Sequence, residues 1–195
     1  HPGYPLFLSS FIGMLWTLAG AFTTAAPATT SGAIAFAVMA LLTGSLAARR
    51  SLGLGLLAGL LLVATESFVA QSAAQYADLL LALAFLAALV LLDAAAAESE
   101  LPPGRLLIAA GLAIGFAPWI KNEGIPFAVA ALALAARRFP IREWLCILLG
   151  SVPGLFATVA VKAMAQGRET MFPRTAGEAF TKLADPARWW QSLAG

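Results

Sequence analysis

The sequence predicts an all-α, polytopic membrane protein, because it is far more apolar than a domain surrounded by water. Of its 195 residues, 61% are apolar and 11% are charged, whereas globular domains contain about 45–50% and about 25%. A water-exposed domain of this length needs a polar, charge-rich surface. The net charge is only +2 and the twelve Lys and Arg are scattered, so the composition also excludes the basic face that nucleic-acid binding requires.

Apolar runs separated by short polar clusters predict about six transmembrane helices. The predicted spans are residues 31–48, 52–69, 77–92, 106–120, 124–136 and 145–161. All are shorter than the ~20 residues that cross a hydrocarbon core about 30 Å thick. We therefore expect the polar residues beside these spans to lie close to the hydrocarbon.

Residues 6–20 precede the spans and are predicted to form a juxtamembrane helix lying in the membrane interface. Tyr4 and Trp16 stand near its two ends, and Pro5 occupies a natural first helical position. The length and the aromatic residues suit an interfacial helix, with a short span as the alternative. Residues 23–31 are expected to form an outer loop, in which Ser31 caps the first span.

Two regions of different composition divide the chain. Residues 1–162 form the predicted transmembrane core, whereas residues 163–195 contain glycine, proline and many charged side chains. We expect the second region to be a water-exposed loop on the outer side, with a short helix at 176–184. Trp189-Trp190 is then an interfacial anchor ahead of a further span. We therefore interpret the chain as an internal part of a larger membrane protein.

The distribution of Lys and Arg predicts the orientation of the spans. Alternate connections contain Arg49, Arg50, Arg105, Arg137, Arg138 and Arg142, whereas the others contain only Lys121 before the last span ends at Lys162. Short cytoplasmic loops carry the excess of Lys and Arg. The arginine-rich connections are therefore predicted to be cytoplasmic, and residues 66–78 and 121–123 to face outward.

Two of the outward clusters carry charges that need an explanation at membrane depth. Asp78 opens an apolar run that has no other charge until Asp93, and Lys121-Asn122-Glu123 joins two spans with almost no loop. Two spans separate Asp78 from Lys121, so both return to the same face and are expected to share one outward pocket. A purely structural ion pair is the alternative, because charges inside membranes commonly pair.

Other patterns indicate packing or exclude chemistry. Gly55 and Gly59, and likewise Gly111 and Gly115, form GxxxG patterns that typically pack membrane helices. His1 is the only histidine, so the chain has no His-rich metal site and no support for a Ser-His-Asp triad. The single cysteine, Cys146, forms no internal disulfide.

Three stretches in a fixed order resemble the membrane glycosyltransferases of the GT-C type. They are His1-Pro2-Gly3-Tyr4-Pro5-Leu6, Gln75-Tyr76-Ala77-Asp78-Leu79-Leu80-Leu81-Ala82 and Trp119-Ile120-Lys121-Asn122-Glu123-Gly124. The likeness is greatest to the bacterial branch related to dolichyl-phosphate-mannose protein mannosyltransferases and to the lipid A aminoarabinose transferase. It implies a multi-pass protein of the bacterial inner membrane, with its active site on the extracytoplasmic side.

The resemblance implies transfer of a sugar from a polyprenyl-phosphate donor to an acceptor hydroxyl on a glycan, lipid or protein. It matches Asp78 and Lys121 to residues of the family, and we predict catalytic roles for these two and for Glu123. Lys121 would stabilise the charge that grows on the leaving phosphate, and Glu123 would orient it. Asp78 would position the acceptor, hold Lys121 or help bind a divalent metal ion as a cofactor.

The resemblance also assigns substrate contacts to residues around these three. They are His1, Tyr4, Tyr76, Lys121 and Asn122. The acidic residue that usually serves as base in this family is expected to lie before His1, so the chain alone is expected to be inactive.

Two other classes of protein remain alternatives to the transferase. A secondary transporter is also helical and rich in Ala, Gly and Leu, but it usually places charged sites near the midplane, whereas the charges here cluster on one face. A non-catalytic membrane scaffold would require Asp78 and Lys121 to be dispensable.

Overall fold

The structure, a computed structural model, describes residues 7–74, 76–97 and 102–164, and these ranges are helical without strands. The helices are α1 (Phe7–Ala19), α2 (Ala25–Arg49), α3 (Leu52–Ala64), α4 (Glu66–Ala74), α5 (Ala77–Ala96), α6 (Pro103–Ile120), α7 (Gly124–Arg138) and α8 (Ile141–Met164). This confirms the all-α prediction. The predicted helix at 176–184 and Trp189-Trp190 lie outside the described residues.

Four of these helices, α2, α5, α6 and α8, are long and apolar enough to cross a membrane. The bent pair α3 and α4 makes a fifth if it forms one span. The chain is therefore a helical membrane protein, as predicted. The predicted span 124–136 is also a helix, α7, but its 15 residues fall short of the ~20 that cross the hydrocarbon.

The predicted span 52–69 is not one continuous helix, because α3 and α4 meet at Thr65 with a bend of 65°. Thr65 has an extended backbone, and its hydroxyl donates to the carbonyl oxygen of Leu61 at 2.8 Å. A threonine that bonds back to the preceding turn bends or ends a helix. The apolar run continues through Thr65, but the helix does not.

The predicted loop at 23–31 is also wrong, because α2 begins at Ala25. Pro27 lies in the first turn, where a proline is tolerated because the backbone nitrogen there has no helical partner. Ser31 does not cap a helix. It is buried inside α2, and its hydroxyl donates to the carbonyl oxygen of Ser72 in α4.

The centre of the molecule is the crossing of α6 and α8, which pack together more extensively than any other pair among the described helices. A side chain at Gly111 or Gly115 would collide with the backbone of α8 at Ile147 and Ser151. Backbones approach this closely only where glycine leaves room. The GxxxG prediction is therefore confirmed here, and also for Gly55 and Gly59, which face α2.

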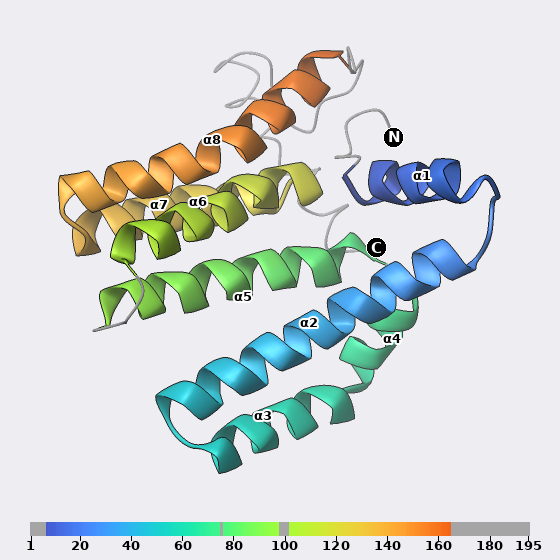
Figure 1. Ribbon diagram of the computed structural model, residues 1–195, viewed down its shortest axis with the longest axis horizontal. Coiled ribbons are helices and arrows are strands. Elements are labelled where there is room, and N and C mark those ends of the chain that lie inside the picture. The colour runs from blue at the N-terminus through green and yellow to red at the C-terminus, as the bar shows by residue number, and fades with distance from the viewer. Residues whose placement is uncertain (1–6, 75, 98–101, 165–195) are drawn as a thin grey trace, which may run out of the picture.

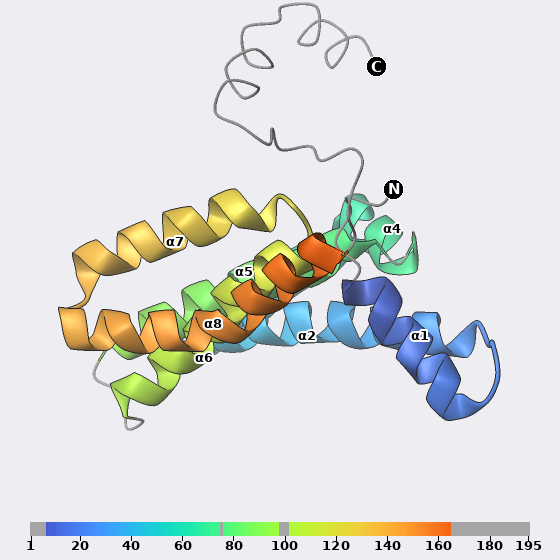
Figure 2. The same cartoon turned by 90° about the horizontal axis from the view of Figure 1, so that it is seen from above.

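The other helices lie around this pair, as Figures 1 and 2 show. α5 packs against α6, while α2 packs against α5 and α3. Figure 2 shows α7 set apart as an outer helix beside the layer of α5, α6 and α8, and the stacked rings of Phe85 and Phe127 connect it to α5. Many leucines of α3 are exposed, which suits a helix surrounded by lipid.

The antiparallel order of the helices separates the charges by membrane face. α2 and α5 end, and α6 begins, at the left of Figure 1, where α7 is also joined to α8. The arginines at these positions include Arg49, Arg105 and Arg138. Asp78 and Lys121 lie at the opposite ends of the helices. The structure therefore groups the two kinds of connection as predicted, while the side of the membrane that each faces stays a prediction.

Candidate functional site

The tight turn between α6 and α7 places Lys121, Asn122 and Glu123 at one end of the helical bundle. The backbone of Lys121 is extended, and its carbonyl oxygen accepts a hydrogen bond from Gly124 N at 2.9 Å. A side chain at residue 124 would collide with the backbone of Ala117 and Pro118. Glycine is therefore required for two helices to meet with three residues between them.

Lys121 joins this turn to α5 through an ion pair. Its Nζ lies 2.6 Å from Oδ1 of Asp78 and 3.5 Å from Oε1 of Glu123. The Lys121 side chain is 16% exposed, whereas those of Asp78 and Glu123 are 42% and 59% exposed. Asp78 lies in the first turn of α5, where the helix dipole favours a carboxylate. The three residues assigned catalytic roles therefore form one cluster.

A residue that the sequence reasoning missed, Lys162, joins the same cluster from the last turns of α8. Its Nζ donates to Oδ1 of Asn122 at 3.2 Å. Asn122, between Lys121 and Glu123 in the turn, is only 9% exposed. Its side-chain amide is therefore buried at this end of the bundle. The signal that identifies Lys162 is the count of spans, because the end of the last span returns to the face that carries Lys121.

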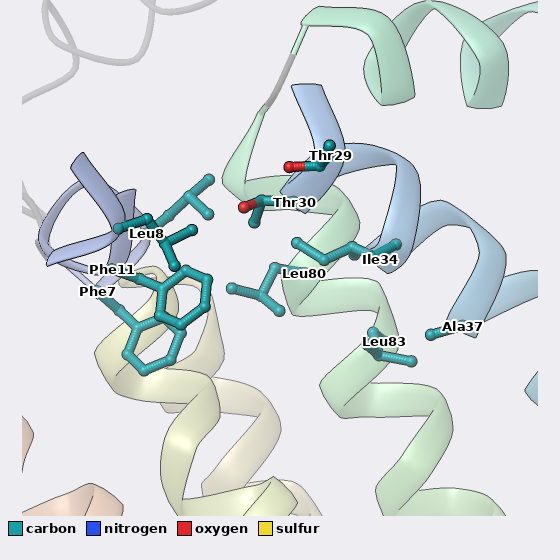
Figure 3. A pocket seen from close by; sticks show the side chains of 11 residues that line it. Phe7, Leu8, Phe11, Thr29, Thr30, Ile34, Ala37, Leu80 and Leu83 are labelled. Atoms are coloured by element: carbon teal, nitrogen blue, oxygen red, sulfur yellow. The ribbon is translucent and has the colours of Figure 1, made fainter. Parts of the chain in front are cut away.

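An apolar pocket of about 530 Å³ lies between α1, α2 and α5. Figure 3 shows side chains of α1, α2 and α5 converging on it, with Phe7, Ile34 and Leu80 on three different sides. Asp78 and Lys121 do not line this pocket, so they do not share it as expected. They lie near the same end of the helices as the pocket, because Leu80 is two residues after Asp78 in α5 and the Phe7 ring lies 4.7 Å from that of Trp119, two residues before Lys121.

The other predicted substrate contacts have mixed outcomes. Tyr76 lines a much smaller pocket with Leu8, Thr30 and Leu79, and it is exposed. That pocket shares Leu8 and Thr30 with the large one. His1 and Tyr4 lie outside the described residues.

The carboxylates of the cluster contact a cation of the protein itself. Asp78 and Glu123 both lie against the ammonium group of Lys121. Within the ranges that the structure describes, no group of three or more His, Cys, Asp or Glu side chains that could hold a metal ion occurs. Binding of a divalent ion by Asp78 stays a prediction.

Comparison with known proteins gives no match to this chain, whether to family models, to curated proteins or to solved structures.

Proposed function

We propose that this chain belongs to a membrane glycosyltransferase of the GT-C type, which transfers a sugar from a polyprenyl phosphate to an acceptor hydroxyl. The reaction takes place on the extracytoplasmic side of the bacterial inner membrane. The observation that carries the proposal is the placement of Lys121, held between Asp78 and Glu123, near the end of the helices at which an apolar pocket opens between α1, α2 and α5.

The chemistry requires a cation at this place. The acceptor oxygen bonds to the anomeric carbon, while the bond from that carbon to the phosphate oxygen breaks and leaves its electron pair on the phosphate. An ammonium group fixed in advance stabilises this growing negative charge. The acceptor proton goes to a base, which the family resemblance places before His1. Asp78 and Glu123 hold the Lys121 ammonium so that it need not reorient during the reaction.

The apolar pocket suits the lipid part of such a donor. Its lining consists of aliphatic and aromatic side chains with two threonines, Thr29 and Thr30, at one end. Burial of apolar surface contributes about 25 cal/mol per Å², so a hydrocarbon chain gains affinity there that the phosphate alone does not supply. A prenyl chain in this pocket would leave its phosphate toward the end of the helices at which Asp78, in the first turn of α5, contacts Lys121.

The test is transfer of labelled sugar from a polyprenyl-phosphate donor by the full-length protein. Lys121→Ala is expected to lower turnover by roughly 10²–10³-fold, the usual effect of losing one fixed electrostatic donor. Lys121→Arg retains charge with altered geometry and should keep part of the activity, while Asp78→Asn should lower it.

The matched control is Arg50→Ala, an exposed cation at the opposite end of the helices, which should leave transfer unchanged. All variants are compared at equal expression and equal melting temperature in detergent. Near-normal transfer by a well-folded Lys121→Ala variant contradicts the proposal and leaves a structural ion pair, as in a scaffold protein.

A secondary transporter is the second candidate, and the break between α3 and α4 favours it. Transporters bind substrate at discontinuous helices, and Thr65 interrupts a run that is otherwise long enough to span. In a transporter, a cysteine introduced at Thr65 should react with impermeant reagents from each side in turn. Labelling from one side only, together with sugar transfer, favours the transferase.

A further inference from the structure

The first turns of α6 and α8 each carry an exposed arginine. Arg105 is the third residue of α6, and Arg142 is the second residue of α8. Among the residues that the structure describes, neither makes an ion pair. The helix dipole disfavours a cation at the start of a helix, so these two arginines do not stabilise the helices to which they belong.

The packing of α6 against α8 brings the two arginines close together. Both helices begin at the left of Figure 1. A side chain at Gly104, beside Arg105, would lie 3.8 Å from the sulfur of Cys146. That sulfur lies 3.5 Å from the carbonyl oxygen of Arg142, one turn earlier in α8. The two helix starts are therefore neighbours, with one arginine on each.

Exposed apolar side chains continue from each arginine along its helix. In α6, Ile108 and Leu112 follow Arg105 at three and seven residues, and both are exposed. In α8, Leu149 follows Arg142 at seven residues and is 65% exposed. Residues at these intervals share one face of a helix. Each helix therefore presents a face with a cation at its start and apolar side chains further along.

The two faces adjoin each other. A side chain at Gly150, the neighbour of Leu149, would collide with the backbone of Ile108, so the helices touch beside both faces. In a helical membrane protein, exposed apolar side chains contact the hydrocarbon, and cations at the helix ends lie at the level of the lipid headgroups. A phospholipid has the same order of parts, with a phosphate above its hydrocarbon chains.

The charge at this end favours an anionic lipid over a zwitterionic one. In the described first turns of α6 and α8 and the last turn of α7, four arginines accompany one carboxylate, that of Glu143. A guanidinium donates two parallel hydrogen bonds to a phosphate and keeps its positive charge at physiological pH. Basic sites between membrane helices on the cytoplasmic side bind anionic headgroups, and this end is the predicted cytoplasmic one.

We propose that Arg105 and Arg142 together bind the phosphate of an anionic phospholipid, such as phosphatidylglycerol, whose acyl chains lie along the exposed apolar faces of α6 and α8. The occupant is a lipid rather than free phosphate, because the two cations stand at the end of a surface that contacts hydrocarbon. The inference is independent of the proposed transferase function, since this site and Lys121 lie at opposite ends of α6.

The experiment measures lipid binding to the full-length protein in detergent by native mass spectrometry. Arg105→Gln and Arg142→Gln are each expected to raise the Kd for phosphatidylglycerol about 10-fold, the lower end of the range for a lost hydrogen bond to a charged group. The matched control is Arg50→Gln, which removes one exposed cation at the same end of the molecule, from α2. Its Kd should stay within about 3-fold, because a charge distant from the phosphate is screened.

Two further probes identify the occupant. Phosphatidylcholine with the same acyl chains should bind the parent at least about 10-fold more weakly than phosphatidylglycerol, because its headgroup has no net charge. Glycerol 3-phosphate, which has the phosphate but no acyl chains, should bind at least about 100-fold more weakly. Equal affinity for phosphatidylcholine removes the role of the arginines, and equal affinity for glycerol 3-phosphate removes the role of the apolar faces; either result overturns the inference.

A second measurement needs no variant. Phosphatidylglycerol should protect Arg105 and Arg142 of the parent protein from modification by phenylglyoxal, as read by mass spectrometry, while Arg50 is modified equally with and without the lipid. Equal modification of Arg105 and Arg142 in both conditions overturns the inference. Parent-like affinity in a folded Arg105→Gln or Arg142→Gln variant also overturns it, and so does equal weakening by Arg50→Gln, which would indicate attraction by the net charge alone.

Discussion

The contact between Lys121 and Asp78 predicts a coupling energy that a double-mutant cycle can measure. The two charged atoms lie 2.6 Å apart, and the Lys121 side chain is 16% exposed. At this separation and an effective dielectric constant of about 20, the Coulomb attraction is about 6 kcal/mol. The cost of withdrawing both charges from water offsets much of it, although the Asp78 side chain keeps 42% of its exposure. We expect a coupling of about 1.5–3 kcal/mol in the free energy of unfolding, within the range of coupled neighbouring residues.

A second ion pair in the same chain provides the control. Arg49 Nε lies 2.9 Å from Oδ2 of Asp93, but these side chains are 37% and 68% exposed. Exposed pairs of this kind contribute about 0–1 kcal/mol. The comparison therefore separates the effect of burial from the effect of distance, which is similar in the two pairs.

The assay is reversible unfolding in lipid bicelles of the parent, Lys121→Met, Asp78→Asn and the double variant. The same four proteins are made for Arg49→Met and Asp93→Asn. A coupling between Lys121 and Asp78 that does not exceed the coupling between Arg49 and Asp93 would refute the reasoning. In that case the short distance between Lys121 and Asp78 contributes no more than a surface contact.

Three further predictions concern other parts of the molecule. Gly115→Ala should destabilise the protein by about 1–3 kcal/mol, because the new methyl group meets the α8 backbone. Gly53→Ala, at a position with open space around it, should be neutral or stabilising by up to about 1 kcal/mol, and unfolding measurements compare the two variants. Ala37→Phe should fill the apolar pocket and weaken undecaprenol binding at least about 10-fold, whereas Ala28→Phe, on an exposed part of α2, should not. A cysteine at Arg138 should resist impermeant reagents added from outside while one at Glu66 reacts, and the reverse pattern would invert the predicted topology.

The positions of the helices were largely predictable, because each apolar run needs to cover about one membrane thickness. α5, α6 and α8 contain their predicted spans and extend beyond them, α5 at its C-terminal end, α6 at its N-terminal end and α8 at both. Hydrogen bonding in a helix continues through polar residues such as Asp93. The break at Thr65 was not predictable from apolarity, because it depends on the backbone of one residue. The early start of α2 was missed because its small polar residues also occur in loops.

The candidate site was predictable as a set of residues on one face but not as a set of contacts. Counting spans brings Asp78 and Lys121 to the same face, and the structure places them in direct contact. The distance depends on the turn that Gly124 permits, which a span count does not describe. The sequence marks Lys162 only as the end of a span, and its contact with Asn122 was not predicted. The apolar pocket depends on how α1, α2 and α5 approach one another, and the hydropathy of each helix alone contains no such information.

α6 and α8 cross at Gly111 and Gly115, and this close contact near the middle of α8 is the point about which that helix can tilt. Ser151 lies at the crossing, and Lys162 lies eleven residues further along the same helix, which corresponds to about 16 Å at ~1.5 Å per residue. A tilt of about 5° at the pivot therefore displaces Lys162 by roughly 1.4 Å, enough to break its hydrogen bond to Asn122. Arg142 and Glu143 lie near the other end of the same helix, so a contact there that tilts α8 also moves Lys162 relative to Asn122.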